Sequence, residues 1–278
     1  MNVDALVKEI LDDLKANRLK LPTLPQVALK INDVISKPDA NAKNVAKVVN
    51  ADTALSVRII QVANSPLVRG ASAVDNVQSA VTRMGMGMVR NIVTSFLVRQ
   101  LFHSKHDNLK IRVGKLWNHS VHVAAISHVL ATQHTSLKAD EAMLAGVIHD
   151  IGKLPIIAKA DDNPSLANNE EVLDKLLDKL HIPLGKVIVH TWGFAPAIVD
   201  AVAEHENFAR DSGKVEIADV VTVANLLSYA GKNHRLAKMD WTRIPAFKKL
   251  DLTPEDSIAA LEDAREEISE IAELLGAS

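Results

Sequence analysis

Apolar side chains recur at helical spacing along most of the chain. In the first fifteen residues, a stripe at i, i+3 and i+4 spacing is formed by Val3, Leu6, Val7, Ile10, Leu11 and Leu14. The segment LPTLPQ (21–26) interrupts this pattern, because a residue that precedes proline disfavours the helical conformation. Helical patterns resume over 26–36, start again at Asp52, and continue into a short helix that ends at Gly85. No segment shows a convincing strand pattern, so the expected fold class is all-α.

The second half of the chain continues the helical pattern. The stretch EVLDKLLDKLHIPLGKVIVHTWGF (171–194) predicts two helices broken at Pro183, since proline lacks the amide hydrogen that a helix interior requires. Near the C-terminus, Thr253 is a suitable N-cap and Pro254 a suitable first helical residue. The apolar residues that follow share one helical face, and they are Ile258, Leu261, Ile268, Ile271 and Leu275.

A polar stretch divides the chain. HSKHDNLKIR (103–112) is typical of a linker between two helical bundles. We therefore expect an N-terminal helical subdomain over 1–105, a second helical bundle over 106–235 and a C-terminal helical tail over 236–278.

The composition narrows the class of protein. Apolar residues make up 47% of the 278 residues but aromatic residues only 3%, which favours packed helices of Leu, Ile, Val and Ala over a β-sandwich. The formal net charge of -2 argues against general nucleic-acid binding, and the lack of cysteine excludes disulfides and thiolate metal sites. The acidic start MNVDALVKEILDDLK does not resemble a signal peptide, and no apolar run approaches the ~20 residues of a membrane span. These features predict a soluble, cytoplasmic protein that does not bind membranes.

The segment LAGVIHDIGKLPI (144–156) places His149 beside Asp150 at the expected end of an apolar helix. Asp140 is a candidate N-cap of that helix, and Gly152 a candidate left-handed stop. A carboxylate in the last turn is disfavoured by the negative end of the helix dipole. A bound cation, or a nearby base such as Lys153, would offset this cost.

A second histidine can be selected by its position on a helix. His119 lies on one apolar stripe with Leu116, Val123, Ile126 and Leu130, whereas His122 and His128 lie off that stripe and are expected to be solvated. From a neighbouring helix, His119 could join His149 and Asp150 as a metal ligand, and imidazole and carboxylate ligands suit Mn, Fe, Zn or Ni. Alternatively, these residues form a metal-free cluster of hydrogen-bonded histidines paired with Asp150, and the residues alone leave both interpretations open.

Two groups of motifs resemble known families. HDIGK (149–153), preceded by WNHSVHVA (117–124), resembles the HD superfamily of metal-dependent phosphohydrolases. LPTLPQ, ADTALSVRIIQVANSP (51–66) and VQSAVTRMGMGMVRNIV (77–93) resemble the HDOD family, the HD-related output domain. This resemblance extends from about residue 21 to about 230 and implies a multi-helical HD-like bundle behind an N-terminal helical subdomain.

The resemblance also implies metal ligands. His119 matches the first histidine of the HD pattern, and His149 and Asp150 match its doublet. His181 in HIPLG matches the place of a further histidine in the binuclear HD-GYP phosphodiesterases. Asn225, in TVANLLS, stands where the pattern has its distal aspartate.

Some family features are missing. In AEHE (203–206), Glu204 replaces the first of two paired histidines while His205 is kept, and the GYP stretch is absent. Asn225 removes one of two negative charges that would be offered to a dication, which predicts weaker metal binding.

The resemblance leaves two functions open. The first is a bacterial signalling or regulatory protein with protein partners and weak or no catalysis, in which the cluster is structural and the metal can be absent. The second is a metal-dependent phosphohydrolase, a phosphodiesterase acting on a nucleotide, in which a metal on His119, His149 and Asp150 activates water. Lys153, and an arginine such as Arg58 or Arg90, would then neutralise phosphate oxygens. His205 would be a general acid or, with His181, hold a second metal.

Overall fold

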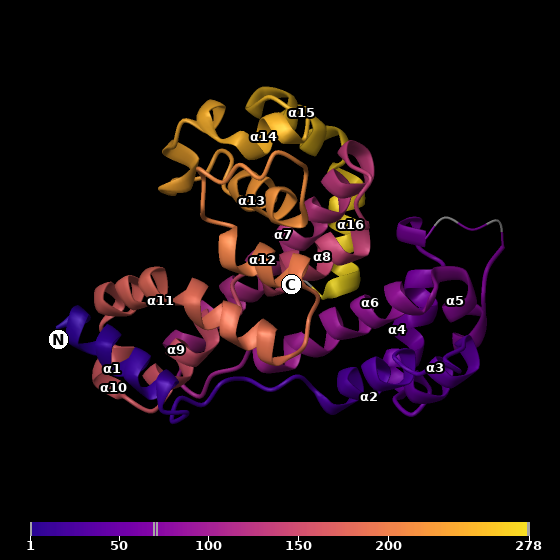
Figure 1. The fold of residues 1–278 in the computed structure, drawn as a ribbon, viewed down its shortest axis with the longest axis horizontal. Helices are drawn as coiled ribbons and strands as arrows, with labels where there is room; N and C mark the ends of the chain where they lie inside the picture. Colours follow the sequence, from indigo (N-terminus) through magenta and orange to yellow (C-terminus); the bar gives the residue numbers. More distant parts are fainter. Residues whose placement is uncertain (1, 69, 71, 277–278) are drawn as a thin grey trace.

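The computed structural model describes residues 2–68, 70 and 72–276, and these residues form helices without any strand (Figure 1). The first half contains α1 (Val3–Lys15), α2 (Gln26–Ile35), α3 (Ala42–Val49), α4 (Thr53–Ala63), η1 (Pro66–Val68), α5 (Val77–Met84), α6 (Met86–Val98) and η2 (Arg99–Leu101). The second half contains α7 (Asp107–His134), α8 (Ala139–Ile148), α9 (Lys153–Asp161), α10 (Pro164–Ala167), α11 (Glu170–Thr191), α12 (Pro196–Glu204), α13 (Ile217–Leu227), η3 (Leu236–Lys238), η4 (Trp241–Arg243), α14 (Pro245–Lys249), α15 (Pro254–Asp263) and α16 (Arg265–Leu275). The predicted all-α class is confirmed.

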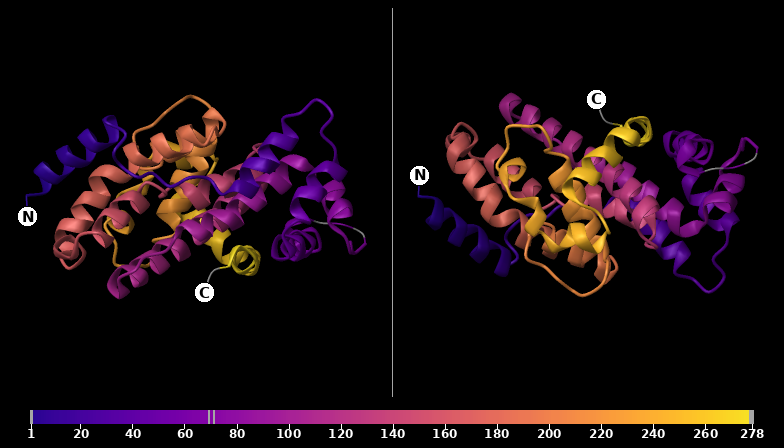
Figure 2. Two further views of the ribbon diagram at one scale, coloured as in Figure 1. Left: turned by 90° about the horizontal axis from the view of Figure 1, so that it is seen from below. Right: turned by 90° about the horizontal axis from the view of Figure 1, so that it is seen from above.

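Helices α7 and α8 pack against each other at the centre, and α12 and α13 cover them (Figure 1). Helix α6 packs on α8 and joins the lobe of α2–α6 to this centre. In all views, α1 and the α3–α5 region lie at opposite ends of the molecule (Figures 1 and 2). The proline-containing stretch between α1 and α2 runs as an extended segment from α1 to the lobe of α2–α6 (Figure 1). Trp192 Nε1 donates to the carbonyl of Pro22 in this stretch at 3.0 Å.

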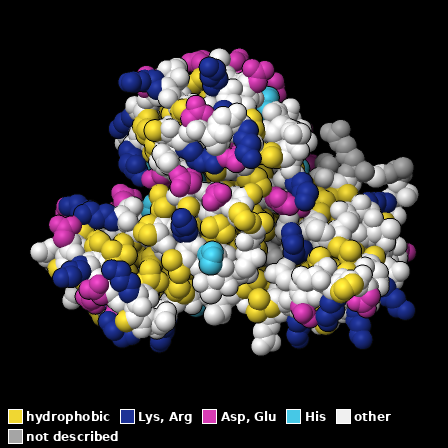
Figure 3. Space-filling view, viewed as in Figure 1, with side chains coloured by type: hydrophobic (Ala, Val, Ile, Leu, Met, Phe, Trp, Pro, Cys, Tyr) yellow, Lys and Arg dark blue, Asp and Glu magenta, His cyan; other side chains and the backbone are white. Residues whose placement is uncertain are grey.

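The molecular surface is mixed in charge. On the face shown in Figure 3, Lys and Arg side chains are interspersed with Asp and Glu, in keeping with the net charge of -2. Among the described residues, no helix is both long and apolar enough to cross a membrane.

Local signals placed several helix ends correctly. Asp52 caps α4 by accepting hydrogen bonds from the amides of Ala54 and Leu55. Gly85 ends α5 with φ of 79°, a conformation that glycine adopts without steric cost. Thr253 and Asp256 form a capping box at the start of α15.

The predicted linker is shorter than expected. Helix α7 already begins at Asp107, so the polar stretch 103–112 is a connection of a few residues followed by the first turns of a 28-residue helix. The carboxylate of Asp161 holds this connection by accepting hydrogen bonds from Ser104 Oγ and the amide of Lys105. The domain boundaries at 105 and 235 stay a prediction.

The predicted break at Pro183 is wrong. Helix α11 runs without interruption from Glu170 to Thr191 and contains Pro183. Proline removes one helical hydrogen bond, but α11 packs against α1, α9 and α12 along its length, and tertiary packing outweighs that local loss. The C-terminal stripe, conversely, is divided at Ala264 between α15 and α16, which leaves Ile258 39% exposed.

The ends of α8 differ from the prediction. Lys138 rather than Asp140 occupies the N-cap position, and Asp140 instead accepts a hydrogen bond from the buried Asn91 on α6. Gly152 has φ of -67° and is therefore not a left-handed stop. It is needed for another reason, because a Cβ there would lie 1.9 Å from the carbonyl oxygen of His181 and 2.4 Å from the amide nitrogen of Gly185.

His128 is buried, not solvated as predicted. Its side chain is 5% exposed on α7, and its Nδ1 has no hydrogen-bond partner among the described residues. Burial lowers the pKa of His128 to about 4, although Asp140 opposes this shift. Protonation of His128 therefore disfavours the folded state.

We predict that Gly152→Ala destabilises the protein by at least about 3 kcal/mol, because the added methyl group collides with backbone atoms of α11 that cannot rotate away. The measurement is urea unfolding. Gly87→Ala is the control and should be neutral or stabilising, since a Cβ at Gly87 meets no atom of the described residues within 4 Å. Equal stabilities of the two variants would contradict the close approach of α11.

We predict that His128→Leu reduces the acid sensitivity of folding. The pKa of His128 is lower in the folded protein, so its contribution to stability is present above about pH 6.5 and is lost as the pH falls toward 4. Between pH 7 and 4.5 the variant should lose about 2 kcal/mol less than the wild type. His190→Gln, at an exposed position, should follow the wild-type profile.

Candidate metal centre

Four histidines and one aspartate from three helices and one turn meet at the centre of the second bundle. His119 comes from α7, His149 and Asp150 from the turn after α8, His181 from α11, and His205 from the end of α12. His149, Asp150, His181 and His205 are at most 2% exposed, whereas His119 is partly exposed. The buried Asn225 lies on α13, which packs against α7, α8 and α12.

Asp150 is the centre of this cluster, and its two carboxylate oxygens face different partners. Oδ2 lies 3.4 Å from His149 Nε2 and 3.8 Å from His119 Nε2. Oδ1 lies 3.7 Å from His181 Nε2 and 3.9 Å from His205 Nε2. Two groups of three potential ligands therefore share Asp150, and within each group the ligand atoms lie within 4.8 Å of one another.

Backbone carbonyls orient three of the imidazole rings. Nδ1 of His149, His181 and His205 lies 2.7, 2.7 and 2.9 Å from the carbonyl oxygens of Gly146, Leu177 and Val202, respectively. Because a carbonyl oxygen only accepts hydrogen bonds, each Nδ1 carries the proton and each Nε2 directs its lone pair toward Asp150. This is the arrangement by which proteins orient histidine ligands of metals.

Electrostatics favour the neutral form of His119 and His205 and the charged form of Asp150. Burial, followed by the neighbouring His149, lowers the pKa of His119 to about 3, and the same causes hold the pKa of His205 well below its usual range. Burial alone would raise the pKa of Asp150, but Lys153 and His149 outweigh it and hold that pKa well below its usual value. Neutral imidazole and ionised carboxylate are the forms that bind metals.

The donor set fits a divalent transition metal. Nε2 of His119 and Nε2 of His149 lie 3.2 Å apart, and two nitrogen ligands about 2.1 Å from one metal are separated by about 3.0–3.4 Å. Three buried atoms of the cluster, His181 Nε2, His205 Nε2 and Asn225 Oδ1, have no hydrogen-bond partner in the described parts of the chain. Buried polar atoms are rarely left unpaired, so these three atoms are available as ligands of a cation.

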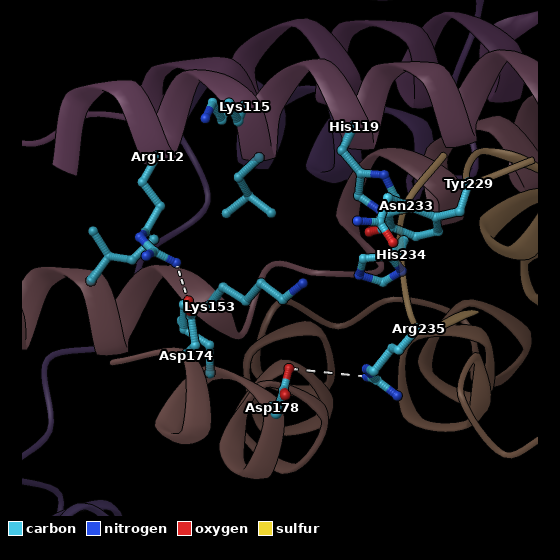
Figure 4. A pocket seen from close by; sticks show the side chains of 13 residues that line it. Arg112, Lys115, His119, Lys153, Asp174, Asp178, Tyr229, Asn233, His234 and Arg235 are labelled. Atoms are coloured by element: carbon cyan, nitrogen blue, oxygen red, sulfur yellow. Dashed lines mark hydrogen bonds and ion pairs between the residues drawn. The ribbon is translucent and has the colours of Figure 1, made fainter. Parts of the chain in front are cut away.

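A cleft of about 500 Å³ opens beside His119. Helix α7 contributes Arg112, Lys115 and His119 to one wall, and α11 contributes Asp174 and Asp178 to the opposite wall (Figure 4). Arg112 pairs with Asp174 across the cleft.

The segment after α13 closes the end of the cleft near His119. Tyr229 stacks on His234 with 3.8 Å between the ring centroids, and its hydroxyl lies 3.5 Å from His119 Nε2. Arg235 pairs with Glu206 at 3.0 Å. It also lies 4.0 Å from Asp178, and Figure 4 shows this contact. The cleft therefore offers cationic, acidic and aromatic groups next to the cluster.

The structure brings together most of the predicted site residues. Lys153 lines the cleft, and its Nζ lies 2.5 Å from Asp150 Oδ2. Its positive charge therefore offsets the unfavourable interaction between Asp150 and the negative end of the helix dipole, as predicted. His205, predicted to be catalytic, is fully buried among the potential ligands and does not line the cleft, which favours a ligand role over proton transfer to a bound molecule. These roles stay predictions.

The sequence misidentified the basic residues near the cluster. Arg58 donates to the carbonyl of Leu274 and Arg90 donates to Asn91, and neither lines the cleft. Arg112 and Lys115 line the cleft instead. They lie seven and four residues before His119 on one helix, and this spacing could have predicted that they share a helix face with it. Arg235 follows an irregular segment, so no periodicity could have placed it.

We predict that added Zn²⁺ raises the melting temperature of the wild type and that Asp150→Asn abolishes this effect, because Asp150 belongs to both ligand groups. A ligand at 100 times its Kd stabilises by about 2.7 kcal/mol, or roughly 5 °C for a chain of this size. Asp178→Asn, a carboxylate change in the cleft, is the control and should retain the full shift. Identical shifts in all three proteins would mean that Zn²⁺ binds elsewhere.

Comparisons with known proteins agree with this architecture. A crystal structure from Shewanella amazonensis SB2B, provisionally described as a metal-dependent phosphohydrolase, is 30% identical, with a TM-score of 0.84 over 97% of this chain and 99% of that one. An HDOD domain protein of unknown function from Geobacter sulfurreducens is 20% identical, with a TM-score of 0.69 over 99% of this chain and 98% of that one.

Two curated relatives match only in part. An uncharacterised protein from Treponema pallidum is 22% identical over 198 residues, or 67% of this chain and 38% of its own length. Ribonuclease Y of Mesoplasma florum is 31% identical over 111 residues, or 40% of this chain and 18% of its own length. The chain therefore spans well under half of either relative. The model of the HDOD domain matches residues 21–208, and the chain belongs to the HDOD domain family.

Proposed function

We propose that this protein is a regulatory HDOD protein that holds a divalent metal, binds a phosphorylated small molecule in its cleft and turns it over weakly or not at all. The observation that carries this proposal is the ion pair between Lys153 and Asp150. Lys153 Nζ lies 2.5 Å from Asp150 Oδ2, the oxygen that faces both His119 and His149.

This ion pair opposes hydrolysis. A hydrolytic metal beside the cleft would need Asp150 Oδ2, and an ammonium group at that oxygen repels a dication only a few ångströms away. Asn225 provides no negative charge to offset the repulsion. A metal on the cleft side would therefore bind weakly, and its water would rarely be activated for attack.

The cleft suits recognition of a phosphorylated ligand, such as a nucleotide. Lys115 offers an ammonium group, whereas Lys153, Arg112 and Arg235 are each paired with an acidic side chain and would have to share their charge with a bound ligand. The acidic residues of α11 can accept hydrogen bonds from hydroxyl or amino groups. An anionic ligand in the cleft would attract the ammonium group of Lys153 away from Asp150. This change in the ion pair would signal to protein partners that the cleft is occupied.

A metal-dependent phosphohydrolase is the second candidate. It is favoured by the oriented histidine cluster beside a cationic cleft, and by the whole-length likeness to the Shewanella protein, which is provisionally described with that activity. Lys153 would then leave Asp150 and neutralise a phosphate oxygen, as a cation next to developing charge does in phosphoryl transfer.

Turnover of bis(p-nitrophenyl) phosphate, with Mn²⁺, Zn²⁺, Fe²⁺ or Ni²⁺ present, distinguishes the two candidates. We expect wild-type kcat to be at least 100-fold below the ~1 s⁻¹ that marks the slow end of typical enzymes. Asn225→Asp, which restores a second carboxylate, should raise turnover, and His149→Ala should show only the background of free metal. Turnover near 1 s⁻¹ in the wild type, lost in His149→Ala, would instead establish the phosphohydrolase.

A further inference from the structure

We infer that the resident metal lies in the buried half of the cluster, on Asp150 Oδ1, His181 and His205, and that Lys153 is the built-in cation of the half that faces the cleft. This inference rests on the metal binding contained in the proposed function. It adds that the two halves differ in kind, one being a metal site and the other an ion pair.

The buried half consists of acceptors that face one another. His181 Nε2 and His205 Nε2 approach Asp150 Oδ1 to 3.7 and 3.9 Å, and neither nitrogen has a hydrogen-bond partner among the described residues. Their Nδ1 protons are already donated to the carbonyls of Leu177 and Val202, so neither ring can turn its proton toward Asp150 without losing that bond.

Bulk solvent does not reach these atoms, since the two rings are at most 1% exposed. Leaving such groups unpaired is costly, and a single dication would satisfy all three atoms.

The half that faces the cleft already contains donors. Lys153 Nζ lies 2.5 Å from Asp150 Oδ2, and the hydroxyl of Tyr229 lies 3.5 Å from His119 Nε2 and can donate to it. His119 also differs from the other three histidines, because its Nδ1 faces the hydroxyl of Ser228 at 3.4 Å rather than a backbone carbonyl. This half is less rigidly oriented and less in need of a cation.

The types of ligand atom limit which metal ions can bind the buried half. Two imidazoles and one carboxylate suit Zn²⁺, Fe²⁺ or Ni²⁺, and oxygen-seeking Mg²⁺ is disfavoured. Ligands about 2.1 Å from a metal in tetrahedral geometry lie about 3.4 Å apart, so binding requires His181 and His205 to approach Asp150 by a few tenths of an ångström. A metal there would join α11, α12 and the turn after α8, and would thus stabilise the bundle.

Metal content per chain tests the assignment. Purified full-length protein and variants are stripped with chelator, loaded with Zn²⁺, passed through a desalting column and analysed by plasma mass spectrometry. We expect about one equivalent in the wild type and in His119→Gln, and less than about 0.2 in His181→Gln and His205→Gln. His190→Gln, an exposed histidine on the same helix as His181, is the matched control and should hold one equivalent.

Lys153→Met tests the other half independently and does not require the buried ligands to be changed. Removal of the ammonium group leaves Oδ2, His119 and His149 free, so this variant should bind about two equivalents. The double variant Lys153→Met/His119→Gln should return to one. X-ray absorption at the zinc edge of the wild type should show two imidazoles in the first shell.

Loss of zinc in His119→Gln with retention in His205→Gln would overturn the assignment and place the metal beside the cleft. An unchanged content in Lys153→Met would also overturn it. Absence of zinc from the wild type would remove both this inference and the metal binding of the proposed function. Fast phosphodiester turnover together with the expected zinc contents would overturn only the weak catalysis of the proposed function.

Discussion

The structure depends on one buried negative charge, that of Asp150. Its side chain is nearly excluded from solvent, yet Lys153, followed by His149, lowers its pKa and holds it ionised. A buried charge without partners is strongly unfavourable, so the helices around it must deliver compensation. They do so with the ammonium group of Lys153 on one carboxylate oxygen, whereas the other oxygen faces the Nε2 atoms of His181 and His205, which accept rather than donate.

Close packing makes this arrangement possible. Gly152 lets the turn that carries Asp150 lie directly against the backbone of α11, at a distance that a methyl group would not allow. Gly146 plays the same part between α8 and α7, where a Cβ would lie 2.6 Å from the Cα of Ala124. The continuity of α11 through Pro183 then holds His181 on the same rigid element as the acidic wall of the cleft. The histidine cluster and the cleft are thus built from shared helices, and a change in one is expected to alter the other.

The unequal environments of the two oxygens connect the structure to the proposed role. The oxygen near the cleft is paired with Lys153, which an anionic ligand in the cleft would attract, whereas the oxygen in the interior faces two imidazoles held by backbone carbonyls. A hydrolase needs its metal next to the substrate and open to water. The proposed regulatory role needs a stable core and a cleft in which ligand binding displaces a charged group. The different partners of the two Asp150 oxygens suit both requirements.

Much of this molecule could be predicted from short-range sequence signals. The all-α class follows from helical periodicity, and the helix ends at Asp52, Gly85 and Thr253 follow from caps that act within a few residues. The grouping of His119 with His149 and Asp150 followed from helix faces and from family resemblance. Tertiary structure alone decided the continuity of α11 at Pro183, the burial of His128 and the pairing of Lys153 with one particular oxygen. It also decided which basic residues, Arg112 and Arg235, line the cleft. These features depend on contacts between helices far apart in the chain, where packing and desolvation outweigh the local preferences that a sequence displays.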